Sequence, residues 1–214
     1  QTIAAQITKL RFFISLVCDC KKTNNADNNY GIPNLPNLET HFVSADSLGT
    51  LENPKQLRFF EEDVIAIKDK LQEVRHKHFM AKTIYQKTKL RNRDKELREE
   101  LAKILESEHV IQSNDALKLV AWNPYDQNSK ADFFDPEWMF GIKDGFDIVI
   151  GNPPYKQIEK GTYSKKAFPY SEGKDKGKQN LYKMFVELGY NLCKQESGIS
   201  CMIVQSSLMC DKSS

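Results

Sequence analysis

Long apolar runs and metal-binding cysteine patterns are the first features that this sequence lacks. No uninterrupted apolar stretch approaches the roughly 20 residues of a membrane-spanning helix. The start of the chain also lacks the layout of a signal peptide. The five cysteines form no metal-ligand pattern, and a single residue separates the closest pair, Cys18 and Cys20. We therefore expect reduced thiols in a cytoplasmic protein that binds no metal.

A large net charge is also missing. The 31 Lys and Arg residues nearly balance the 29 Asp and Glu residues, so the net charge is only +2. Such a balance neither requires nor excludes a nucleic-acid partner, because binding depends on how the charges cluster. The length of 214 residues is enough for one sizeable core with an appendage.

The first 51 residues predict one helix and one short strand. Apolar residues recur at helical spacing over residues 2–17, which is typical of an amphipathic helix. A polar loop follows, and His41–Asp46 then fits a short strand that ends in an acid. The helical stripe consists of Ile3, Ile7, Leu10, Ile14 and Val17.

Charged residues dominate from Lys55 to about Ser107, where apolar residues recur every three or four positions. Pro54 suits the start of a helix, and no Gly or Pro interrupts the following run. The pattern predicts a long helical hairpin with its turn near residues 76–83. Its charges fit a solvated face. The alternative is a phosphate-contacting patch made of Lys82, Lys87, Lys89, Arg91 and Arg93.

The last third of the chain alternates between strands and helices. Residues 145–151 form a short apolar run bounded by glycines, which is typical of a parallel strand buried on both faces. A basic loop leads to a predicted helix over residues 180–194. Ile199–Val204 then fits a second buried strand. The order predicts an α/β fold with a parallel sheet.

Asn152-Pro153-Pro154-Tyr155 follows the first of these strands and carries the chemistry. Ligands of α/β proteins bind at the carboxyl ends of parallel strands. The two prolines make the turn rigid and remove two N–H donors, so the turn presents carbonyl groups. Asn152 adds a side-chain acceptor, and Tyr155 adds a flat face for stacking.

This combination suits the exocyclic amine of adenine, which is a poor nucleophile because its lone pair is delocalised into the ring. If the Asn152 side chain and the Pro153 carbonyl accept its two N–H bonds, the nitrogen becomes tetrahedral and its lone pair is free to attack a methyl group. Catalysis then depends on positioning and on acceptors aimed at the developing positive charge. Since a duplex hides this amine, the adenine must be flipped out and stacked.

Phe146–Tyr155 resembles motif IV of the amino-methyltransferases. The other motifs occur in the order of the gamma-class N6-adenine DNA methyltransferases, as in large type IIG restriction–modification enzymes. Phe42–Leu48 resembles motif III, Asn180–Phe185 resembles motif V, and Gly198–Val204 resembles motif VI. The N-terminal helix resembles the helix after motif II, and the helical insertion before motif IV is also similar to that of the type IIG enzymes.

The resemblance implies an S-adenosylmethionine-dependent enzyme that methylates a flipped adenine in double-stranded DNA, within a restriction–modification system. It implies a catalytic role for Asn152, Pro153, Pro154 and Tyr155. It assigns Asp46, Ser47, Asn152 and Phe185 to the cofactor. The implied fold is a partial Rossmann-like methyltransferase sheet with a long helical hairpin inserted.

The resemblance also divides the chain into three segments. Residues 1–51 form the first part of the methyltransferase core, 52–120 form the helical insertion, and 121–214 form the second part of the core. The Gly-rich motif I and the aromatic of motif VIII do not occur in this sequence. We therefore expect the chain to act with further N- and C-terminal parts of the same enzyme, and to bind cofactor poorly and be inactive on its own.

Two alternatives remain open at this stage. Asn-Pro-Pro-Tyr also serves protein-glutamine N5 methyltransferases, where the same acceptors hold an amide nitrogen. Those enzymes are compact, so the charged helical insertion favours DNA. The second alternative is a non-catalytic interaction fragment that uses the hairpin to bind a partner.

Overall fold

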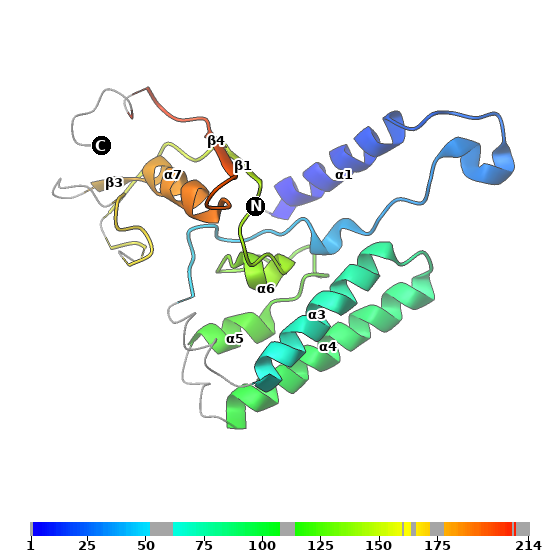
Figure 1. Cartoon of the computed structure of the whole chain (residues 1–214), viewed down its shortest axis with the longest axis horizontal. Helices are drawn as coiled ribbons and strands as arrows, with labels where there is room; N and C mark the ends of the chain where they lie inside the picture. The colour runs from blue at the N-terminus through cyan, green and yellow to red at the C-terminus, as the bar shows by residue number, and fades with distance from the viewer. Residues whose placement is uncertain are drawn as a thin grey trace. The chain divides into compact units, whose positions relative to one another are not determined.

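The computed structural model describes residues 2–51, 62–107, 114–159, 161–163, 166–171, 178–206 and 208. Helices make up most of this part of the chain, and the strands are short (Figure 1). In chain order the elements are α1 (Thr2–Cys18), η1 (Ala26–Gly31), η2 (Leu38–Thr40), α3 (Glu62–Met80), α4 (Ile84–Ser107), α5 (Asn114–Ala121), α6 (Pro136–Phe140), β1 (Ile148–Gly151), β2 (Gln157–Glu159), β3 (Lys178–Asn180), α7 (Leu181–Leu192) and β4 (Ile199–Met202).

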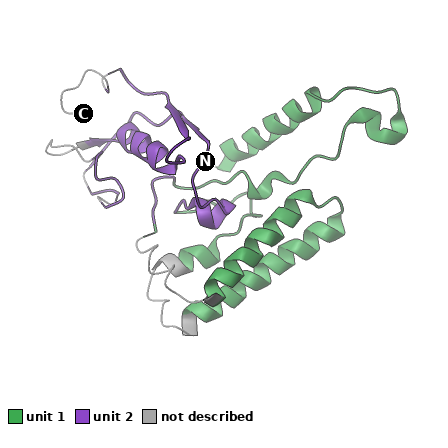
Figure 2. Cartoon of the chain, viewed as in Figure 1, with its two compact units in different colours: residues 1–46, 51–132 green, residues 47–50, 133–214 purple. Residues whose placement is uncertain are grey.

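The chain folds into two compact units (Figure 2). Unit 1 comprises residues 1–46 and 51–132, and unit 2 comprises residues 47–50 and 133–214. The helical insertion therefore clusters with the first 46 residues. This grouping by contacts differs from the three segments suggested by the sequence, which remain a prediction.

The predicted helical hairpin is present in unit 1 as α3 and α4 (Figure 1). Its turn lies at residues 81–83, within the predicted range. Thr83 and Gln86 form a capping box at the start of α4, because the Gln86 N–H donates to Thr83 Oγ1 at 3.2 Å and the Thr83 N–H donates to Gln86 Oε1 at 3.3 Å. The predicted start near Pro54 lies outside the described residues. The apolar residues buried along the two helices are Val64, Ile67, Leu71, Val74, Leu97, Leu101 and Leu105.

A buried charge network joins the two helices. Asp94 is fully buried and accepts hydrogen bonds from Arg75 Nε at 3.0 Å and from Arg98 Nε at 2.9 Å. The Arg75 guanidinium also stacks over the ring of Trp122, 4.9 Å from its centroid. Tyr125 lies beside Asp94, and burial together with this carboxylate raises the pKa of the phenol. The network therefore fixes the hairpin and connects it to residues 122–125.

His78 is fully buried at the end of α3 and is neutral in this arrangement. Its Nε2 accepts a hydrogen bond from Arg91 Nε at 3.2 Å, which requires an unprotonated Nε2. Burial lowers the pKa of His78, and the charges of Arg91 and Lys87 lower it further, whereas Glu39 and Asp94 oppose the shift. Protonation thus costs more in the folded chain than in the unfolded chain.

We expect the free energy of unfolding to fall as the pH drops below 6.5. A histidine whose folded pKa is depressed contributes stability that is fully present above its unfolded pKa and is lost as the pH falls toward the folded pKa. The slope reaches at most about 1.4 kcal/mol per pH unit for this one proton. His41 adds an effect of the same sign, since burial lowers its pKa too. Urea unfolding between pH 7.5 and 5 should give a flatter profile for His78→Gln than for the parent, and equal slopes would contradict the assignment.

Unit 2 contains a small parallel sheet in which β1 pairs with β4, with Ile148 opposite Ile199 and Gly151 opposite Met202. Helix α7 connects the two strands and packs against them (Figure 1). Gly189 permits the close packing, because a Cβ there would lie 2.6 Å from both the Met202 Cε and the Ser200 Oγ atoms. A second sheet pairs β2 with β3 in antiparallel fashion, which was not foreseen. The combination of helices with a parallel pair is compatible with the predicted α/β class.

Burial of both strands on two faces was a wrong prediction. Ile148, Ile150, Ile199 and Ile203 are each at least 60% exposed. The alternation of exposed and half-buried residues along β1 shows that α7 covers one face of the sheet while the other face is open. A parallel strand is buried on both faces only when helices cover both sides of its sheet.

Two further expectations for the first 51 residues need correction. The helix α1 forms as predicted, but Ile3, Ile7, Leu10 and Ile14 of its apolar stripe are all more than half exposed. Residues 41–46 do not form a strand. Ala45 makes one isolated parallel bridge, to Ala131, and a strand needs a longer ladder of hydrogen bonds than this.

None of the described helices combines the length and the apolar character that crossing a membrane requires.

Candidate active site

The tetrapeptide Asn152-Pro153-Pro154-Tyr155 directly follows β1 in unit 2. It therefore lies at the carboxyl end of a parallel strand, as the sequence suggested. Pro153 is buried, whereas Asn152 and Pro154 are exposed. The Tyr155 side chain is about half exposed, at 48%. One proline thus anchors the turn, and the amide of Asn152 remains open to a ligand.

Ile203, which follows β4, holds this turn through its backbone. Its N–H donates to the Gly151 carbonyl at 3.0 Å, and its carbonyl accepts the Tyr155 hydroxyl at 2.8 Å. The same hydroxyl approaches Asn152 Oδ1 at 3.3 Å. Since one hydroxyl carries one hydrogen, the shorter contact to Ile203 is the stronger bond. The two segments that leave the paired strands are therefore tied together, which fixes the orientation of the Tyr155 ring.

Gly151 allows the strands to approach at this point. A Cβ atom at residue 151 would lie 2.5 Å from the sulfur of Met202, closer than real Cβ contacts occur. A side chain here would displace Met202 or shift the strand end. Glycine immediately before Asn152 thus leaves room for the Met202 side chain of β4.

Helix α7 carries the next residues of the site. Tyr182 is buried, and its ring meets the Tyr155 ring edge-on, with the centroids 6.3 Å apart. Phe185 follows three positions later, so it lies on the same side of the helix one turn along. Its half-buried ring packs against the apolar cluster that contains Leu48. Leu48 in turn places its neighbour Ser47 beside this cluster.

Most of the predicted site residues are gathered in one unit. Unit 2 contains Ser47, Phe185 and the whole of Asn152–Tyr155, whereas Asp46 belongs to unit 1. Asp46 is half-buried, and its backbone N–H donates to the Ala131 carbonyl at 2.8 Å. No direct contact joins Ser47 to the tetrapeptide among the described interactions. The predicted roles of these residues remain predictions.

Asp147, in the motif before Asn152, has a structural partner. Its Oδ1 atom accepts a hydrogen bond from Lys194 Nζ at 2.6 Å. This bond and the lysine charge hold the pKa of Asp147 below its ordinary value. The pair joins the segment before β1 to the chain after α7.

Two interactions within unit 2 were not foreseen from the sequence. The Ile203 carbonyl is a backbone group, so the identity of residue 203 does not reveal this hydrogen bond. Glu187 is buried on α7 and holds the loop at residues 170–171. It accepts the Tyr170 N–H at 3.2 Å, the Ser171 N–H at 2.8 Å and the Ser171 hydroxyl. In the sequence, the sign of this role was an acidic residue placed between the apolar positions of α7.

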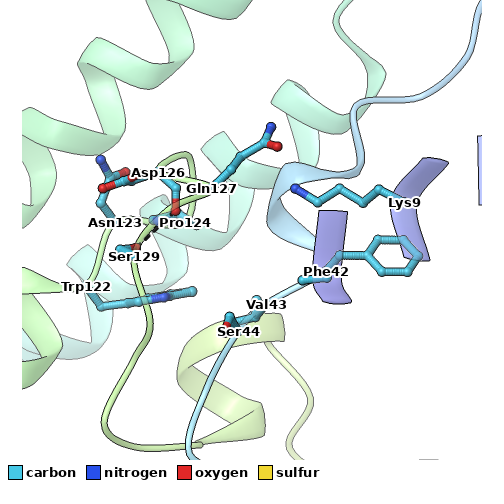
Figure 3. A pocket seen from close by; sticks show the side chains of 11 residues that line it. Lys9, Phe42, Val43, Ser44, Trp122, Asn123, Pro124, Asp126, Gln127 and Ser129 are labelled. Atoms are coloured by element: carbon cyan, nitrogen blue, oxygen red, sulfur yellow. Dashed lines mark hydrogen bonds between the residues drawn. The ribbon is translucent and has the colours of Figure 1, made fainter. Parts of the chain in front are cut away.

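Unit 1 contains a small hollow (Figure 3), and its lining residues are distant in sequence from Asn152–Tyr155. It is formed by α1, residues 42–44 and the loop at residues 122–129, and it encloses about 330 Å³ including its open mouth. Burial lowers the pKa of Lys9, whose side chain extends along the hollow, and Glu39 partly opposes this shift. None of the predicted catalytic or cofactor residues lines it, so we assign it no part in the site.

Comparison with known proteins gives one family match over the whole chain. The family model described as Eco57I restriction-modification methylase matches residues 1–214. No curated protein and no solved structure matches.

Proposed function

The chain belongs to the Eco57I restriction-modification methylase family, and from this membership we propose that Asn152–Tyr155 is the methyl-transfer centre of an adenine-N6-specific DNA methyltransferase. The donor in this proposal is S-adenosylmethionine. The acceptor is an adenine flipped out of double-stranded DNA. The Rossmann-like sheet is the scaffold that this proposal implies, with β1 and β4 as two of its strands.

The observation that carries the proposal is the position of the tetrapeptide. It follows a parallel strand directly, with the Asn152 amide exposed and the Tyr155 ring fixed through the Ile203 carbonyl. This arrangement offers a rigid acceptor beside an aromatic ring at the edge where α/β folds bind ligands. The family membership favours DNA over a protein glutamine amide as the acceptor.

In the proposed mechanism, Asn152 Oδ1 and the Pro153 carbonyl accept the two N–H bonds of the adenine amine. These hydrogen bonds draw the nitrogen out of conjugation with the ring, so that its lone pair becomes available. As the nitrogen gains positive charge, both acceptors bind it more strongly than they bound the neutral amine. The bond between the methyl group and its sulfur would break as the new N–C bond forms, and the amine then releases one proton to water. The rigid turn makes this arrangement before the substrate binds.

Tyr155 supplies the stacking surface for the flipped base. Its ring is half exposed, and it is held at the hydroxyl by Ile203 and at the edge by Tyr182. A ring held at two points loses little conformational freedom when a base stacks on it. A stacked base is worth about 1–3 kcal/mol in related single-strand contacts.

The residues proposed for the cofactor fit its chemistry. The half-buried Phe185 ring offers an apolar face, because it packs against the Leu48 cluster without being fully covered. Asp46 and Ser47 offer a carboxylate and a hydroxyl for polar groups of the cofactor. S-adenosylmethionine, when bound, supplies a methyl group attached to a positively charged sulfur. We propose a second role for Asn152 at this edge, in binding the cofactor.

A transfer assay separates DNA from protein as the acceptor. The polypeptide encoded by the complete reading frame is incubated with methyl-labelled S-adenosylmethionine, duplex DNA and a glutamine-rich protein domain. We expect the label in DNA and none above background in protein. Label in the protein with none in DNA would overturn the proposed substrate class.

A further inference from the structure

The connection between α3 and α4 carries a long stretch without acids. Residues 74–93 contain seven Lys and Arg residues and no Asp or Glu. This stretch ends α3, forms the turn and begins α4, so it is the tip of the hairpin (Figure 1). The remainder of α4 differs, because residues 95–103 contain three basic and three acidic side chains. Positive charge is therefore concentrated at one end of the insertion.

Four of the seven cations at this tip already have acidic partners. Arg75 is paired with Asp94, and Arg91 with Glu39 at 3.0 Å. Lys77 and Arg93 bind acids within their own helices, Glu73 and Glu96 respectively. Within the described part of the chain, Lys82, Lys87 and Lys89 form no ion pair. These three lysines are available to an external anion.

The tip combines these lysines with groups that suit a polyanion. Lys82 and Lys89 are exposed, and Lys87 is half-buried on the side of α4 that faces α3. Tyr85 is 75% exposed, and Lys89 follows it by one helical turn on the same side of α4. Thr88 and Asn92, also exposed, add hydrogen-bond donors on this side. The side opposite is the one that packs on α3, through Leu97 and Leu101. The basic surface is thus held on a rigid hairpin that is anchored by the buried charge network.

We propose that this surface, made of Lys82, Tyr85, Lys87, Lys89 and Asn92, binds the phosphate backbone of double-stranded DNA outside the flipped adenine. The inference rests on the proposed function, in which DNA is the substrate. Duplex DNA offers a negative charge every ~1.7 Å, which matches three lysines distributed over two helical turns and the adjoining turn. Lysines, a tyrosine hydroxyl and an asparagine amide are all common phosphate ligands. The contacts carry no sequence information, so they position the enzyme on its substrate.

The test compares two triple variants of the same net charge. Lys82→Gln/Lys87→Gln/Lys89→Gln removes the charges at the tip. Lys70→Gln/Lys95→Gln/Lys103→Gln removes three exposed lysines from the same two helices away from the tip. Binding to a labelled 30-base-pair duplex is followed by fluorescence anisotropy between 50 and 200 mM salt, with the complete polypeptide.

We expect the tip variant to bind DNA roughly tenfold or more weakly than the parent, with the largest difference at 50 mM salt, because the salt-dependence slope is reduced by up to ~2.7, about 0.9 for each lysine. The control variant should keep the parent slope. Equal losses in both variants would show a general charge effect and overturn the inference, as would an unchanged tip variant or a parent that binds no DNA at 50 mM salt.

A competition experiment separates DNA from an acidic protein partner. Polyglutamate at the same concentration of negative charge should compete poorly with the duplex. Equal competition would assign the surface to an acidic protein and overturn the proposal for DNA. Failure here is distinguishable from failure of the proposed function, because methyl transfer to DNA is measured separately and should be retained in the tip variant at a saturating protein concentration.

Discussion

Asn152→Ala is expected to lower the rate of methyl transfer by about 10²–10³-fold, the loss typical of removing one group that stabilises developing charge. The reason is that the Asn152 side chain supplies one of two acceptors that release the amine lone pair. Alanine retains the backbone, and the exposed position of Asn152 means that little packing is lost. The measurement is single-turnover transfer to duplex DNA by the complete polypeptide, together with calorimetry of S-adenosylmethionine binding.

A matched control separates the acceptor from the stacking surface. Tyr155→Phe keeps the aromatic ring and removes the hydroxyl that binds the Ile203 carbonyl. We expect a loss of about tenfold or less, the equivalent of one neutral hydrogen bond. Cofactor affinity should change little in either variant. If Asn152→Ala loses cofactor binding to the same degree as transfer, the residue acts by holding the cofactor and the proposed acceptor role fails.

Asp94→Ala is expected to destabilise unit 1 by about 3–5 kcal/mol, because it leaves the buried Arg75 and the partly buried Arg98 without their counter-charge. Asp94 is fully buried, and Arg75 Nε and Arg98 Nε both donate to it. The loss is a large part of the stability of an ordinary domain. Urea unfolding followed by circular dichroism of the helices measures it.

Two controls define the origin of this loss. Glu99→Ala removes an exposed partner of Lys95 on the same helix, and we expect at most about 0.5 kcal/mol there, as is usual for surface pairs. Replacing Asp94 and its two arginines together by Leu and Met should restore much of the stability, since an apolar cluster needs no counter-charge. A loss below 1 kcal/mol for Asp94→Ala would show that water reaches these arginines in the folded chain.

The hairpin was predictable because its signal is local. Apolar spacing and the absence of Gly and Pro define two helices without knowledge of their neighbours. The buried Asp94 was not predictable, because a charged residue in a charged segment has no sequence mark that distinguishes it from its exposed neighbours. Its burial follows from the opposing positions of Arg75 and Arg98 on the packed helices.

The tetrapeptide was recognisable for a different reason, because the chemical properties of its four residue types can be read from the sequence alone. What the sequence lacked was its support: the Ile203 carbonyl, the edge of Tyr182 and the close approach of Met202 to Gly151 are contacts made across the sheet. The strand expected at residues 41–46 failed because a strand exists only through its partner. Ala131 offers only one bridge to this segment, and the sequence pattern within residues 41–46 does not show that the partner is so short.

The open face of the β1–β4 sheet illustrates the same limit. Ile148, Ile150 and Ile199 look like core residues in the sequence, yet they are exposed in unit 2. Residue type measures the tendency to be buried, whereas burial depends on whether another element covers the face. The apolar run therefore predicted the strand correctly, but its predicted burial on both faces was wrong.

The most direct test of adenine-N6 transfer is mass spectrometry of nucleosides from duplex DNA after incubation with S-adenosylmethionine and the complete polypeptide that contains Asn152–Tyr155. The account predicts N6-methyladenine in the parent reaction and none above background with Asn152→Ala. Methylated cytosine in place of methylated adenine, or equal amounts of N6-methyladenine from both proteins, would contradict it.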